Sequence, residues 1–167
     1  MTLSETIARF EADPSAARST PTVTATLENG HARLTAGSFN WEADLPPAIG
    51  GGNLAPSPTA YLLGALAGCG VAFLVDTLAP QFDVRLDGVT ATARCSSDAR
   101  GLLGMGDASP ALSDLQLDIE IRSPDPTAKT QPMLDAWRER CPIFLALARP
   151  NDVALTTRTA AAEHAPA

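Results

Sequence analysis

Hydrophobic and polar residues alternate along much of this chain with the two-residue period of a β-strand. Six segments follow this pattern and are predicted to be strands: residues 22–27, 31–36, 38–43, 89–95, 115–121 and 153–158. Asn29-Gly30 separates the first two segments and is a strong two-residue hairpin signal. The first three strands are therefore expected to form an antiparallel meander. Residues 96–114 are rich in Ser, Gly and Asp and predict a loop, with a bulged continuation of the strand at 101–105.

An uncharged apolar run over residues 60–75 lies between the two groups of strands. Ser57 is expected to cap its first turn and Pro58 to occupy the first helical position. Apolar side chains point in every direction, as in a helix that is covered on all sides. At 1.5 Å per residue the run measures about 24 Å, which is short of the hydrocarbon core of a bilayer, about 30 Å. We therefore predict a buried core helix and no membrane span.

Three further helices are predicted from 3.6-residue periodicity and capping signals. Thr2 and Glu5 form a capping box for a short amphipathic helix that ends at Asp13-Pro14. Its apolar stripe needs a surface to cover, on its own domain or on a partner chain. A second helix is predicted to run to about residue 140, with Met133, Leu134 and Trp137 on one face, and a third over 143–148. Strands and helices in this order indicate an α+β fold.

Length and net charge limit the number of domains and the kinds of partner that this chain is expected to have. A chain of 167 residues indicates one domain, expected over residues 21–158, with a helical extension over 1–20 and a disordered tail over 159–167. The net charge of −7 argues against binding to nucleic acid or to an anionic membrane surface. Charged residues in the first 13 positions leave no apolar core for a signal peptide, so we expect a cytoplasmic protein.

The three cysteines carry the candidate chemistry. An odd number of cysteines is no disulfide framework, and no CxxC or paired His spacing suggests a metal, so no metal or cofactor is expected. Cys69 lies between Gly68 and Gly70, where the surface of the core helix is barest. Cys141 occupies the N-cap of the helix over 143–148. Cys95, on a strand, is expected to be structural.

Four segments together resemble the family of OsmC and organic hydroperoxide resistance proteins. They are Asp44-Leu45-Pro46 leading into Gly50-Gly51-Gly52, APSPTAYLLGALAGC over 55–69, SDARGLLG over 97–104, and Cys141-Pro142-Ile143. The likeness covers roughly residues 12–158. It implies antiparallel sheets around the central cysteine helix, in an intertwined obligate homodimer with two equivalent sites at the interface.

The resemblance also implies a thiol peroxidase that acts on organic hydroperoxides. Cys69 matches the attacking cysteine and Cys141 the resolving one, so an intrachain disulfide that a dithiol reductant reopens is expected. Cys95 matches no position of the family. An apolar site would favour an alkyl hydroperoxide or another lipophilic small molecule.

One part of the family's site is replaced in this sequence. Active members carry a carboxylate just after the second proline of the helix start, and it holds an arginine that activates the thiol; Thr59 and Ala60 stand there in this chain. Arg33, on the predicted hairpin, is the candidate arginine, and Arg18 is a poorer one. His31 is expected to be solvated. Two alternatives to a peroxidase stay open: a dimer that binds a lipophilic ligand without turnover, and a thiol enzyme that acts on another electrophile.

Overall fold

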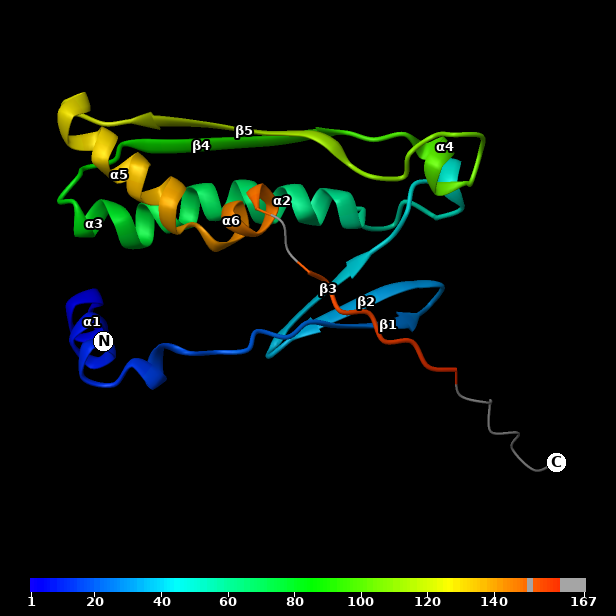
Figure 1. Cartoon of the computed structure of the whole chain (residues 1–167), viewed down its shortest axis with the longest axis horizontal. Helices are drawn as coiled ribbons and strands as arrows, with labels where there is room; N and C mark the ends of the chain where they lie inside the picture. Colours follow the sequence, from blue (N-terminus) through cyan, green and yellow to red (C-terminus); the bar gives the residue numbers. More distant parts are fainter. Residues whose placement is uncertain (150–151, 160–167) are drawn as a thin grey trace.

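The structure, a computed structural model, describes residues 1–149 and 152–159. It is an α+β fold with two separate antiparallel sheets, as predicted (Figure 1). The first sheet contains β1 (Thr24–Glu28), β2 (His31–Ala36) and β3 (Phe39–Ala43), and the second contains β4 (Gly88–Ser96) and β5 (Ser113–Arg122). The main helices are α1 (Leu3–Ala12), α2 (Pro58–Phe73), α5 (Thr127–Arg140) and α6 (Pro142–Ala148).

The meander β1-β2-β3 confirms the predicted hairpin. Asn29 and Gly30 both have positive φ, 51° and 85°, and Glu28 pairs with His31 across the turn. The side chains of directly paired residues point to the same side of a sheet. In the observed register, the apolar residues therefore lie together on one face. This face, called the apolar sheet face below, comprises Ala25, Leu27, Ala32, Leu34, Ala36, Phe39, Trp41 and Ala43. Leu27 and Phe39 are 84% and 73% exposed, so one chain leaves much of this face uncovered.

The core helix begins where the sequence predicts. The Ser57 side chain accepts a hydrogen bond from the Ala60 amide, and Pro58 is in the first turn. The helix continues through a π-helical segment, Leu74–Leu78, into α3 (Ala79–Gln81), making 24 residues in all. The helix thus extends beyond the uncharged run over 60–75, because Asp76 is exposed and does not interrupt it.

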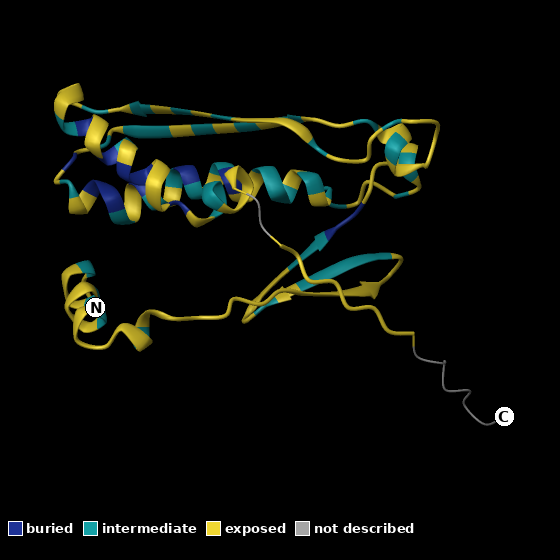
Figure 2. Cartoon of the chain, viewed as in Figure 1, coloured by how far each residue is buried: buried dark blue, intermediate teal, exposed yellow. Residues whose placement is uncertain are grey.

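At 24 residues the helix is long and apolar enough to cross a membrane by length and composition. Only the uncharged part of the helix is thus shorter than the hydrocarbon core of a bilayer. Packing favours a core role, since α2 lies along β4 and β5 and Leu74 and Leu78 are fully buried (Figures 1 and 2). Burial is one-sided, however. A Cβ at Gly64 or Gly68 would meet no atom within 4 Å, so the prediction of a helix covered on all sides is wrong for a single chain.

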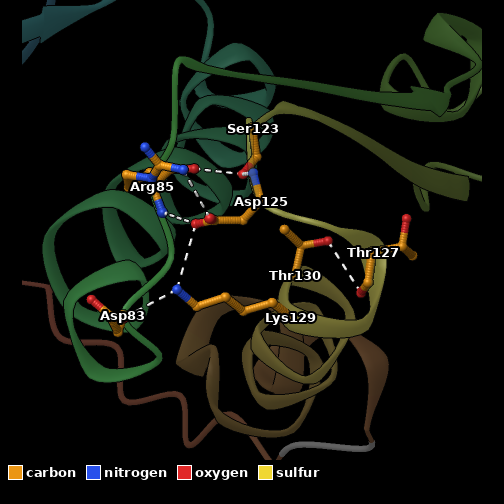
Figure 3. A network of polar contacts seen from close by, with 7 residues as sticks. All are labelled: Asp83, Arg85, Ser123, Asp125, Thr127, Lys129 and Thr130. Atoms are coloured by element: carbon orange, nitrogen blue, oxygen red, sulfur yellow. Dashed lines mark hydrogen bonds and ion pairs between the residues drawn. The ribbon is translucent and has the colours of Figure 1, made fainter.

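The core gathers around the end of the long helix, where buried residues of α5 meet it (Figure 2). The fully buried side chains are Leu74, Leu78, Met133 and Cys141. Polar contacts fix where α5 begins (Figure 3). Asp125 accepts a hydrogen bond from the Arg85 backbone N–H at 2.7 Å, and the Lys129 Nζ lies 3.6 Å from Asp125 and 3.1 Å from Asp83. These contacts join the segment before β4 to the start of α5.

Two strand predictions are corrected. Residues 153–158 form no strand and are exposed, because no sheet edge pairs with them within the described residues. The continuation expected at 101–105 is replaced by a short helix, α4 (Ala99–Leu102), since Asp98 caps it by accepting a hydrogen bond from the Arg100 N–H. The strands predicted at 89–95 and 115–121 are present, and an irregularity between Arg94 and Ser96 places Cys95 at a bulge.

The N-terminal helix α1 has the predicted capping box, with the Thr2 and Glu5 side chains each accepting a hydrogen bond from the other's backbone N–H. It contains no buried residue, and among the described residues its main contacts are with the turn Pro14–Ala17 that follows. The limits proposed above for the extension, domain and tail stay predictions, and the tail from residue 160 lies outside the described residues.

Candidate functional site

Two cysteines that are 72 residues apart in sequence meet inside the chain. The Sγ atoms of Cys69 and Cys141 lie 2.8 Å apart. Cys69 is in the fourth turn of α2, and Cys141 is the fully buried N-cap of α6. A disulfide, with a bond of about 2.05 Å, would need an approach of less than about 1 Å. Cys95 is a free thiol elsewhere, on β4.

Trp137 holds the two cysteine helices together. Its indole N–H donates a hydrogen bond to the Cys69 carbonyl at 3.2 Å, and its own carbonyl accepts one from the Cys141 N–H at 2.8 Å. The ring packs at a tilt against Phe144 of α6, with centroids 5.4 Å apart. The sequence predicts Trp137 as a core or interface residue but carries no signal of this link, because the contact joins residues 68 positions apart.

The first turn of α6 faces both sulfurs. Cys141 Sγ accepts a hydrogen bond from the Phe144 N–H at 3.5 Å, and the Ile143 N–H favours the thiolate of Cys69. Burial nevertheless raises the pKa of the Cys69 thiol to about 11, with further contributions from the hydrogen bond to Cys141 and the charge of its thiolate. In one isolated chain Cys69 is therefore a protonated thiol near neutral pH. A nearby cation would lower this pKa.

Arg33 does not supply that cation to Cys69 of its own chain. Its Nη1 donates a hydrogen bond to Glu42 Oε1 at 3.2 Å, and no contact in the described part of the chain joins it to Cys69. Arg33 and Glu42 are directly paired across β2 and β3, on the side opposite the apolar sheet face. The role of Arg33 thus stays a prediction. Glu42 was missed, although the hairpin at Asn29-Gly30 and the next turn together place it opposite Arg33.

His31 joins the same cluster, so its predicted solvation is wrong. The side chain is 10% exposed, and Nε2 lies 3.4 Å from Glu42 Oε2. Its Nδ1 is buried and has no hydrogen-bond partner in the described residues. The Tyr61 hydroxyl donates a 2.5 Å hydrogen bond to the Glu42 carbonyl. This bond ties β3 to the first turn of α2.

The segment before α2 is fixed by Asp44. Its carboxylate accepts hydrogen bonds from the N–H groups of Leu45, Gly52 and Leu54, and these bonds, that of Leu54 foremost, lower its pKa. Gly51 is required there because a Cβ would lie 1.9 Å from the Leu45 carbonyl oxygen. Two open apolar hollows border this region, of about 490 and about 580 Å³. The second lies between the apolar sheet face and α2, lined by Leu34, Trp41, Tyr61, Leu62 and Ala65 among others.

A metal site is not formed by the described residues, which contain no group of three or more His, Cys, Asp or Glu side chains suited to hold an ion. The chemistry available where Cys69 and Cys141 meet is that of their two thiols. The helix start carries Thr59 and Ala60 and so offers no carboxylate of its own.

Several solved structures share this fold. An OsmC-like protein from Mycoplasma pneumoniae superposes with a TM-score of 0.64 at 22% identity, over 78% of this chain and 88% of that one. An organic hydroperoxide resistance protein from Legionella pneumophila gives a TM-score of 0.57 at 18% identity, over 77% and 89% of the two chains. Another from Elizabethkingia anophelis, with thiocyanate bound, gives 0.57 at 17% identity, over 77% and 88%.

No curated protein matches the chain at the sequence level. The sequence model of the OsmC-like protein family, by contrast, matches residues 50–156, which include α2 and both facing cysteines. That match covers more than half of the 167 residues. The chain therefore belongs to the OsmC-like family, as its motifs indicated.

Proposed function

We propose that this protein is a thiol peroxidase that reduces organic hydroperoxides with Cys69 and Cys141. The observation that carries the proposal is the 2.8 Å separation of the two sulfurs in the core. Two thiols at this distance can alternate between the reduced pair and a disulfide without rearranging the fold. The names of the similar proteins from Legionella and Elizabethkingia, organic hydroperoxide resistance proteins, support the substrate class.

The reaction has three balanced steps. The Cys69 thiolate attacks one peroxide oxygen, the O–O bond breaks, and the alkoxide takes a proton and leaves as an alcohol, so that Cys69 becomes a sulfenic acid. The Cys141 thiolate then attacks the Cys69 sulfur, and the hydroxyl leaves as water after taking a proton. A dithiol reductant opens the resulting disulfide by exchange and is itself oxidised. Such a cycle suits a reducing cytoplasm, which we propose as its location.

The site needs a second copy of the chain. Within one chain Cys69 has a raised pKa and no contact with Arg33, while the apolar sheet face and one side of α2 are exposed. We propose a homodimer that covers these apolar surfaces and brings Arg33 of the partner subunit, from the opposite side of its sheet, to Cys69. A guanidinium at that position would lower the thiol pKa and bind the peroxide oxygens.

A second function is favoured by two observations. Burial raises the pKa of Cys69 to about 11, and Thr59 and Ala60 replace the expected carboxylate, which together suit a pocket that binds a lipophilic molecule without turnover. The two functions differ in whether hydroperoxide is consumed.

The test is consumption of cumene hydroperoxide with dithiothreitol as reductant. The wild type and Cys95→Ser should turn over, Cys69→Ser should not, and peptide mapping without reduction should show Cys69 linked to Cys141. In Cys141→Ser the sulfenic acid should persist and be trapped, then go on to sulfinic acid with excess peroxide. A folded wild type whose Cys69 resists oxidation would support the ligand-binding function instead.

A further inference from the structure

We propose that Glu42 is the carboxylate that positions Arg33 for the Cys69 chemistry. The inference rests on the proposed peroxidase function and deepens it by naming a positioning residue. Glu42 lies on β3, outside the helix start where the sequence led us to expect an acid. Its contacts in the structure suit this role.

The contact between Arg33 and Glu42 orients the guanidinium of Arg33. Arg33 and Glu42 face each other in register on β2 and β3, and Arg33 Nη1 lies 3.2 Å from Glu42 Oε1. A guanidinium has five N–H donors, and this contact occupies one of them. The Arg33 side chain is 36% exposed, so its remaining donors are open to a second chain.

Glu42 is itself fixed on two sides. His31 Nε2 lies 3.4 Å from Oε2, the oxygen that Arg33 does not use, and the His31 side chain is only 10% exposed. On the other side, the Tyr61 hydroxyl binds the Glu42 carbonyl. Tyr61 directly follows Thr59 and Ala60, the positions where the acid is missing. Tyr61 therefore anchors the Glu42 backbone, on β3, to the same helix start.

A purely structural role is the competing explanation, because opposite charges paired across strands stabilise a sheet. The second sheet provides a matched control. Arg94 Nη1 lies 2.6 Å from Asp118 Oδ2 between β4 and β5, with both side chains more than half exposed. It is an ion pair of the same kind, and neither residue belongs to the cysteine site or the Glu42 cluster.

The experiment compares Glu42→Gln, Glu42→Asp and Asp118→Asn in the full-length protein, each checked for a native thermal transition. Glu42→Gln should lower kcat/KM for cumene hydroperoxide by roughly tenfold to a hundredfold, since it misplaces a group that contacts the substrate. Glu42→Asp should recover part of the loss, and Asp118→Asn should stay within about twofold of wild type. In an Arg33→Met background, Glu42→Gln should cause no further loss.

The pH dependence of Cys69 alkylation supplies a second readout. Loss of a negative charge by itself would move the midpoint of the profile to lower pH, because a thiolate is then repelled less. Loss of a positioned guanidinium would move it to higher pH. We expect the shift to higher pH in Glu42→Gln and none in Asp118→Asn.

The outcomes separate this inference from the proposed function. A folded wild type that does not consume hydroperoxide removes both. Turnover that depends on Arg33 but is unchanged in Glu42→Gln removes only the inference, as does an equal loss from Glu42→Gln with and without Arg33. If Glu42→Gln does not fold, the same comparisons are made with Glu42→Asp, which should then show a smaller loss that also disappears without Arg33.

Discussion

The first half of this chain, from α1 to β3, and the second half, from α2 to α6, differ in how completely each buries its own apolar residues. From α2 to α6, helices and the β4-β5 pair enclose a core in which four side chains are fully buried. In α1 no residue is buried, and β1 is exposed along its whole length. The second half thus encloses an apolar core of its own, although one side of α2 stays exposed. The first half presents apolar residues that a single chain leaves uncovered, which is the physical case for a partner.

The largest effect is expected from breaking the proposed dimer. Phe39, on the apolar sheet face, is 73% exposed in one chain. Phe39→Asp would bury a carboxylate at the interface, so the protein should become monomeric and lose most of its peroxidase activity, by about a hundredfold or more. Light scattering measures the mass at micromolar concentration. A wild type that is already monomeric there would contradict the proposed dimer.

The next prediction concerns the pKa of the Cys69 thiol in the monomer and in the dimer. In the Phe39→Asp monomer the midpoint of Cys69 alkylation should stay near the value for one chain, about 11, because burial and Cys141 raise the pKa and nothing opposes them. In the wild-type dimer Arg33 of the partner subunit should bring the midpoint down. Alkylation rates across pH measure both. Equal midpoints in the two proteins would mean that no cation reaches Cys69 from a second chain.

The same substitution should have different costs in the two halves. Leu78 is fully buried and Leu27 is 84% exposed. In the Phe39→Asp background, Leu78→Ala should lower the free energy of unfolding by about 2–5 kcal/mol and Leu27→Ala by less than about 0.5 kcal/mol. Urea denaturation measures both changes. Similar costs would show that the first half has a core of its own.

The smallest effect concerns the contacts that fix the start of α5. Hydrogen bonds from Arg85, its backbone N–H foremost, lower the pKa of Asp125 in the folded protein. A depressed carboxyl pKa adds stability above the unfolded value of about 4, and that stability is lost as pH falls through the lower folded value. Asp125→Asn should therefore flatten the acid decline of the unfolding free energy. Urea denaturation of the wild type and Asp125→Asn at several pH values between about 2 and about 6 would reveal this change. Asp118→Asn, which removes one partner of an exposed ion pair, is the control.

How much was predictable depended on the distance over which each interaction acts. The capping box of Thr2 and Glu5, the cap at Ser57, the turn at Asn29-Gly30 and the N-cap at Cys141 all appear in the structure as predicted. Each involves residues within a few positions of one another, so local sequence specifies them. The meeting of Cys69 with Cys141 was expected from the family likeness, because spacing alone does not report a contact over 72 residues.

Tertiary structure decided the rest. The alternating segment 153–158 forms no strand, since alternation specifies a face but not a partner edge. Burial of His31 and the pairing of Arg33 with Glu42 depend on strand register, and the link from Tyr61 to Glu42 depends on how α2 docks against β3. The sequence by itself determined where helices and hairpins begin and which residues are apolar. Which charges meet, and which apolar faces stay open to a partner, depended on packing between segments far apart in the chain.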